Sequence, residues 1–117
     1  KAVREIARNN QRLFDVVRDD LRDILNSQYI KPEEVTRISD SFNDIIENSL
    51  EDLDFIEQIL SSDFLKMTDA ERADVLTKKE TKSQEMVAEI NKKTERYRDI
   101  ISFRKMQDKI NNRETSY

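Results

Sequence analysis

Residues 32–60 read PEEVTRISDSFNDIIENSLEDLDFIEQIL, and this stretch decides the fold. Its apolar side chains recur every three or four positions, and Ser49 fills the one gap in the row 35, 38, 42, 45, 49, 53, 56, 60. Steps of three and four repeated for about seven turns describe one stripe along a long α-helix. The rest of that helix is largely acidic. A helix with two such different faces must lay its stripe against other helices.

Residues 2–28 predict a first long helix with a similar stripe. Its row consists of Val3, Ile6, Asn10, Leu13, Val17, Leu21, Ile24 and Gln28. The mostly alternating steps of three and four are the spacing of a coiled coil. A buried Asn10 would fix the register of the helices at some cost in stability, whereas an Asn10 near a frayed end would be hydrated. The sequence leaves both readings open.

A short loop joins these two helices. Residues 26–31 break the apolar pattern, and Pro32 then suits the first turn of a new helix, where its missing N–H would be unpaired in any case. So short a connection between two long helices favours an antiparallel hairpin. We therefore predict a coiled-coil-like helical hairpin over residues 1–63.

The composition indicates an all-α fold with few connections. The chain has 117 residues, about the usual size of one domain, with no glycine and one proline. Tight turns that require a positive φ are almost excluded without glycine. Charged residues make up 39% of the chain and apolar residues 36%, which is typical of long, narrow helices with much exposed surface.

Residues 64–117 predict a less regular second half. Thr68 and Glu71 match a capping box ahead of a short helix at 69–76. Residues 77–85 contain no apolar side chain, and we interpret them as an exposed helical segment in preference to a flexible linker. A third helix, thinner and more basic, follows from Met86 to Ile110, and we expect residues 111–117 to be disordered.

The residue types exclude most catalytic chemistry. Cysteine and histidine are both absent, so there is no thiol nucleophile, no disulfide and no imidazole base or metal ligand. No glycine-rich phosphate loop is present either. We predict a non-enzymatic protein with no cofactor, no metal and no small-molecule substrate. No apolar run approaches the roughly 20 residues that cross a bilayer, so the expected location is the cytoplasm, away from membranes.

Charge is unevenly distributed along the chain. Residues 1–30 carry a net charge of +1, residues 31–65 of −8 and residues 66–117 of +3. A polyanion could therefore meet only the two arms. The candidate nucleic-acid contacts are Arg4, Arg8, Arg12, Lys92, Lys93, Arg96, Arg104 and Lys105. Interleaved acids such as Glu95 and Asp99 also fit an ordinary exposed helix with ion pairs.

The apolar stripes are wider than one helix pair can cover. A two-helix seam uses one row from each helix, which leaves Phe14, Leu25, Ile46 and Leu50 beside the seam. The third helix has too few apolar residues to cover them all. We therefore predict a homo-oligomer whose interface includes these four residues.

A family resemblance rests on the first half of the chain. The residues that carry it are Val3-Arg4, Arg8-Asn9-Asn10, the run 13–25, the loop with Pro32 before Glu34-Val35, and the stripe 38–60. Together they resemble the oligomerisation hairpin of small terminases from large contractile-tailed phages. The resemblance implies a DNA-packaging ring that binds duplex DNA and stimulates the large terminase ATPase. The alternative is a cytoskeletal, trafficking or regulatory helical bundle that binds protein partners only.

Overall fold

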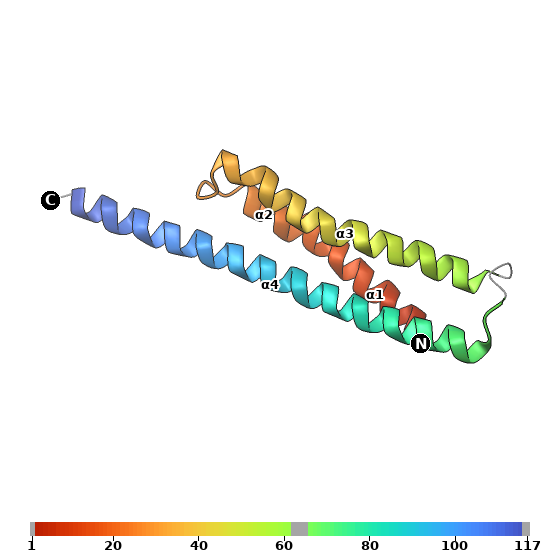
Figure 1. Ribbon diagram of the computed structural model, residues 1–117. Coiled ribbons are helices and arrows are strands. Elements are labelled where there is room, and N and C mark those ends of the chain that lie inside the picture. The colour runs from red at the N-terminus through yellow and green to blue at the C-terminus, as the bar shows by residue number, and fades with distance from the viewer. Residues whose placement is uncertain (1, 62–65, 116–117) are drawn as a thin grey trace.

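The computed structural model describes the backbone of residues 2–61 and 66–115, and within these ranges every regular element is helical. The molecule is a narrow three-helix bundle with principal extents of 75 × 21 × 16 Å. Two antiparallel helices form a hairpin, and a longer helix lies along both and continues past the hairpin loop (Figure 1). The predicted all-α fold with a long helical hairpin is confirmed.

The first helical rod contains a π-helical turn. It comprises α1 (Ala2–Asp15), the π-helix η1 (Val16–Leu21) and α2 (Arg22–Leu25). A π turn spans five residues where an α turn spans four, and the buried positions accordingly step from Val16 to Leu21. The predicted stripe is wrong at three positions, since Val16 is buried in place of the half-buried Val17, and Val3 and Gln28 are exposed. The helix also ends at Leu25, three residues earlier than predicted.

Helix α3 (Pro32–Leu60) begins as the sequence predicts, with Pro32 in its first turn. The Lys31 N–H donates to Glu34 Oε1 at 2.9 Å, and this bond occupies a backbone donor just before the helix. Ile30 is buried and closes the tip of the hairpin. At the other end, the Ser61 hydroxyl donates to the Gln58 carbonyl at 2.9 Å. Hydrogen bonds between residues close in sequence thus fix both ends of α3.

Helix α4 (Asp69–Thr115) is one unbroken helix of 47 residues. The Glu71 N–H donates to Thr68 Oγ1 at 3.1 Å, which is half of the predicted capping box. Residues 77–85 are helical, as we predicted. The expectation of separate helices before and after this segment is wrong, because one helix runs through it. The segment also has a buried side, because Ser83 is 1% exposed. The expected disorder is wrong for residues 111–115, which continue the helix, and residues 116–117 lie outside the described part.

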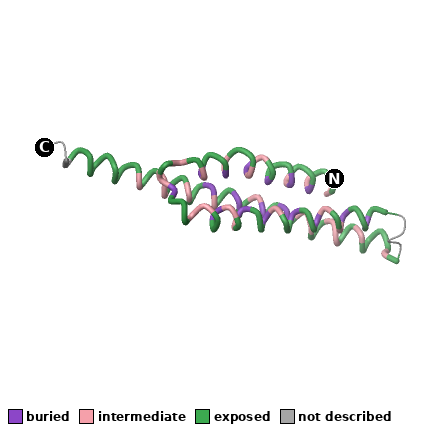
Figure 2. Tube along the Cα trace, turned by 90° about the horizontal axis from the view of Figure 1, so that it is seen from above, coloured by how far each residue is buried: buried purple, intermediate pink, exposed green. Residues whose placement is uncertain are grey.

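The core runs along the line where the three helices meet (Figure 2). Ile38, Phe42 and Ile45 of α3 are almost fully buried there. Helix α4 contributes Met86 and Ile90, and the next members of its row continue the steps of three and four: Thr94, Tyr97, Ile101 and Arg104. The Tyr97 ring lies 6.1 Å from the Phe42 ring between centroids. Apolar burial thus joins α4 to the hairpin over most of the hairpin's length.

Polar side chains interrupt this core. Asn10, Ser49, Asp52 and Ser83 are each at most 5% exposed. Beyond them, Ile6, Ile56 and Ile59 are buried without belonging to the main apolar cluster. Asn10 therefore takes the buried alternative of the two that the sequence left open, and its Nδ2 donates to the Ile6 carbonyl at 2.8 Å. A buried polar position of this kind favours one register over others.

We predict that Ile45→Asp unfolds or severely destabilises the bundle. Ile45 is 4% exposed in the centre of the core. Losing the aliphatic side chain and burying an unpaired carboxylate costs on the order of 3 kcal/mol or more. Thermal melts followed by circular dichroism measure the loss. Asn43→Asp is the control, because it adds a carboxylate to an exposed position of the same helix, and an Ile45→Asp melt equal to that of the control would contradict the prediction.

Candidate functional site

The candidate site consists of two apolar surfaces that the bundle leaves uncovered. Within the described part of the chain, the exposed large apolar side chains fall into two groups. The first group lies on the hairpin and comprises Val3, Phe14, Leu50 and Leu60. The second group lies on the far end of α4 and comprises Phe103, Met106 and Ile110. Side chains of this size that gather on one face mark interaction surfaces more often than scattered ones do.

The first surface is a groove between α1 and α3, which we call the hairpin groove. Its volume is about 390 Å³, and it is lined by Val3, Leu50, Leu53, Asp54, Ile56, Glu57 and Leu60. Leu50 is 46% exposed and Leu60 54%. The two carboxylates, Asp54 and Glu57, give the apolar groove an acidic border. Phe14 is eleven residues after Val3, about three turns, and so lies on the same face of the first rod.

The second surface is the end of α4, residues 103–115, which we call the overhang. It continues beyond the hairpin loop, and its residues 105–113 are exposed (Figure 2). Phe103, Met106 and Ile110 are 56%, 53% and 49% exposed. Met106 and Ile110 line a shallow depression together with Lys109 and Arg113. The border of this second apolar surface is therefore basic.

The predicted interface residues divide into two pairs. Phe14 and Leu50 are exposed, at 37% and 46%. Leu25 and Ile46 are half-buried and pack against the core of their own chain. The bundle thus leaves the first pair uncovered and covers much of the second.

The predicted basic contacts are mostly exposed but do not form one patch. Arg4, Arg8 and Arg12 lie in one exposed row on α1, and Arg8 pairs with Glu5 at 3.2 Å. Lys92 and Arg96 are also exposed, and they line a shallow depression that includes Glu95 and Asp99. The remaining three differ in their surroundings: Lys93 is half-buried, Lys105 is exposed, and Arg104 is bound within the molecule.

Polar contacts fix the position of α4 along the hairpin. The Asp52 carboxylate of α3 accepts Lys79 Nζ at 2.7 Å and Lys82 Nζ at 3.3 Å. Lys79 also lies 4.9 Å from the centre of the Phe55 ring, within cation–π range. Nearby, Asn9 Nδ2 donates to Ser83 Oγ at 2.8 Å. These contacts involve residues 77–85. Because this segment contains no apolar side chain, nothing in the sequence indicates that it packs against the hairpin.

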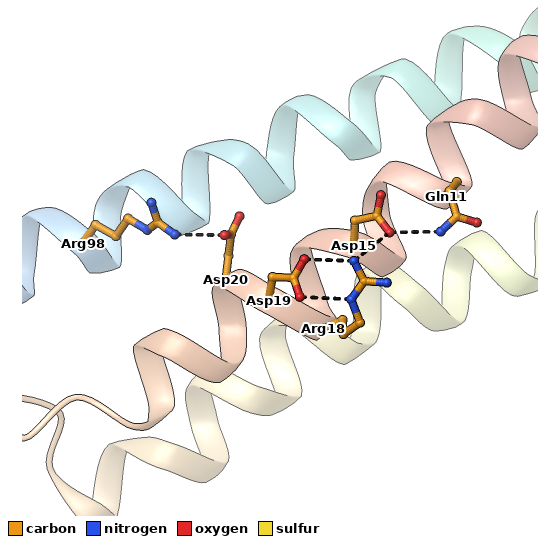
Figure 3. A network of polar contacts seen from close by, with 6 residues as sticks. All are labelled: Gln11, Asp15, Arg18, Asp19, Asp20 and Arg98. Carbon is orange, nitrogen blue, oxygen red and sulfur yellow. Dashed lines mark hydrogen bonds and ion pairs between the residues drawn. The ribbon is translucent and has the colours of Figure 1, made fainter.

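A second set of contacts lies around η1 (Figure 3). Arg18 donates to both oxygens of Asp19 at 2.9 Å and lies 3.5 Å from Asp15. Asp20 projects towards α4, where Arg98 Nη2 donates to its Oδ1 at 2.9 Å. The Arg18–Asp19 pair is exposed, so it contributes little to stability. The Asp20–Arg98 pair joins two helices and orients them instead.

Arg104 is held at the hairpin tip and is not available to a polyanion. Its guanidinium donates to both carboxylate oxygens of Glu34, at 2.7 and 3.0 Å, and to the Tyr29 carbonyl at 2.7 Å. The Arg104 hydrogen bonds, together with the Lys31 N–H, lower the pKa of Glu34 to about 2. Of the predicted basic residues, this one has a structural role. Its distance in sequence from Glu34 left no local signal of the pairing.

Sequence reasoning missed most residues of the two surfaces. The sequence pattern places Val3 in the seam and Leu53 and Leu60 in the buried stripe of α3, although Leu60 is 54% exposed. It places Met106 and Ile110 in the third helix without a surface role. The available signal was the change of row in α4, because the buried row reaches Arg104 while the apolar residues step to 103, 106 and 110.

Comparison with known proteins finds no family whose pattern matches the chain, no similar curated protein and no similar solved structure. Among residues 2–61 and 66–115, no helix combines the length and hydropathy that a bilayer-spanning segment requires. The functional reading therefore depends on the two exposed apolar surfaces and on the placement of the charges around them.

We predict that the Glu34–Arg104 pair makes stability depend on acid pH. Because folding lowers the pKa of Glu34 from 4.5 to about 2, the pair stabilises the protein above the higher value and the contribution is lost as pH falls towards the lower one. Glu34→Gln should thus lower the urea midpoint at neutral pH, and its deficit should shrink on acidification. Glu33→Gln, an exposed neighbour, is the control. A deficit that stays constant with pH would contradict the assignment.

Proposed function

We propose that the chain is a non-enzymatic assembly module whose copies associate through the apolar surface of the hairpin. The observation that carries this proposal is the exposure of Phe14 and Leu50, together with Val3 and Leu60, on a hairpin whose other large apolar side chains are buried or half-buried. Covering such side chains removes apolar surface from water, at roughly 25 cal/mol per Å². A second copy of the chain supplies that cover.

Within such an assembly, we propose the role of a small terminase, which holds duplex DNA and engages the large terminase ATPase. Support comes from the resemblance of the first half of the chain and from the exposed row of Arg4, Arg8 and Arg12. Repeated copies would repeat this row, and phosphate contacts act together along a duplex. Lys92, Arg96 and Lys105 are further exposed cations on α4.

The alternative is a bundle that binds only protein partners, in a cytoskeletal, trafficking or regulatory role. One observation favours it. Lys92 and Arg96 share their depression with Glu95 and Asp99, so the local charge is nearly balanced. A balanced surface attracts a phosphate backbone weakly. Binding to duplex DNA is therefore the measurement that separates the two roles.

We predict that the unmodified protein sediments as an oligomer at high micromolar concentration. Phe14→Lys combined with Leu50→Lys should give a smaller species that stays helical, because both side chains are exposed and their replacement leaves the core intact. Asn43→Lys with Asn48→Lys is the control, because it adds the same two positive charges to exposed positions of the hairpin. An unmodified protein that sediments as a monomer would overturn the proposal, and so would a double variant with the same mass as the unmodified protein.

We predict that duplex DNA binding depends on salt and on the α1 row. Arg4→Gln with Arg12→Gln should weaken binding and lower the slope of log K against log salt by about one unit per lost phosphate contact. Lys31→Gln with Arg37→Gln removes the same charge from the hairpin tip and should change binding less. Fluorescence anisotropy with a labelled duplex measures both. No salt-dependent binding by the unmodified protein would favour the protein-only role.

A further inference from the structure

We propose that the overhang of one copy docks in the hairpin groove of a second copy. This inference rests on the proposed assembly and names its contact surfaces. The two surfaces hold most of the exposed large apolar side chains of the described residues, and Phe14 lies on the same helix face as the groove. Each has an apolar centre and a charged border, and the two borders have opposite signs. A second copy of the chain is therefore the occupant that fits the groove.

The charges of the two borders complement each other. Asp54 and Glu57 line the groove, and Lys109 and Arg113 line the depression on the overhang. Residues 50–60 carry three exposed acidic side chains, Glu51, Asp54 and Glu57, and no basic one, whereas residues 105–113 carry three basic and one acidic. Opposite potentials of this kind steer association and select one orientation of a docked helix. An overhang packed on another overhang would bring like charges together instead.

The row of apolar residues on the overhang faces a direction that the home bundle does not use. The buried row of α4 runs through Tyr97 and Ile101 to Arg104, and its continuation falls at Asp108. The overhang row runs through Phe103, Met106 and Ile110. Phe103 precedes Arg104 by one residue, and Met106 and Ile110 are each two residues from Asp108, so the offsets are about 100° and 200° around an α-helix. The overhang thus presents a separate apolar face and is not a frayed end of the same seam.

The overhang cannot reach the groove of its own chain. Lys79 contacts Asp52, which is next to the groove residue Leu53. Met106 follows Lys79 by 27 residues of unbroken helix, which is about 40 Å at 1.5 Å per residue. The two surfaces therefore lie at opposite ends of one molecule (Figure 1). Only a different copy can bring them together.

Such a contact joins two different surfaces, so a pair of copies keeps one free groove, on one copy, and one free overhang, on the other. Contacts of this type close into rings or grow into open filaments, depending on the rotation between neighbours. A helix laid into an apolar groove also presents anchors at steps of three and four, as the overhang does. This geometry differs from a two-fold pairing of hairpin faces, and the difference can be measured.

The test uses two complementary variants of the full chain. The first, Met106→Glu with Ile110→Glu, disables the overhang and keeps the groove. The second, Leu50→Lys with Leu60→Lys, disables the groove and keeps the overhang. Ser102→Glu with Gln107→Glu is the matched control, because it adds the same charge to exposed positions of α4 outside the apolar row. Circular dichroism verifies that every variant is helical, and sedimentation velocity with native mass spectrometry gives the masses.

We expect each disabled variant to be a monomer, the control to assemble like the unmodified protein, and an equal mixture of the two disabled variants to give a species of twice the monomer mass. That dimer should weaken at least tenfold when salt is raised or when Asp54→Lys and Glu57→Lys are added to the first variant. A mixture that stays monomeric while the unmodified protein assembles overturns this contact but leaves the proposed assembly intact. Assembly of either disabled variant alone has the same meaning. A monomeric unmodified protein overturns both proposals.

Discussion

A buried carboxylate sets the register of α4 against the hairpin. Asp52 is 5% exposed, and its charge is balanced by two lysines one turn apart on α4. Sliding α4 by one turn would separate this group from at least one lysine and would also break the Arg104–Glu34 pair at the hairpin tip. Leaving a buried charge without a partner costs several kcal/mol. Because α4 has 47 residues and α3 has 29, a fixed register also fixes which part of α4 extends beyond the bundle.

The polar positions in the core cost some stability and define the pairing of the helices. Asn10 Oδ1, Ser49 Oγ and the second oxygen of Asp52 are buried and accept no hydrogen bond within the described residues. An apolar side chain at each position would bury more favourably. It would also allow the three stripes to shift by a heptad with little penalty, since the steps of three and four repeat. The polar positions therefore specify one register in a seam whose apolar spacing repeats.

Periodicity predicted the fold well where one apolar stripe decides the packing. The stripe of residues 32–60 predicted the length of α3 and its buried face as far as Ser49, and Pro32 predicted its start. Beyond Ser49, Asp52 and Ile59 are buried in place of Leu53 and Leu60. The features that apolar periodicity did not predict depend on the contacts of individual side chains. The π turn adds one residue between the buried Val16 and Leu21, and apolar periodicity averages over it. Residues 77–85 are held by Ser83 and two lysines, whose partners Asn9 and Asp52 are distant in sequence. Exposure of Met106 and Ile110 follows from the register of α4, which local pattern cannot supply.

The π turn has a consequence for the length of the chain. A π-helical turn holds one residue more than an α-helical turn, so the first rod contains one residue that its rise along the bundle does not require. Without it, Leu21 and Ile24 would rotate away from the core by about 100° relative to Leu13. The additional residue rotates the second half of the rod, so that both halves face the same neighbouring helices. It also places Asp20 at the edge of the bundle, where Arg98 donates a hydrogen bond to its carboxylate.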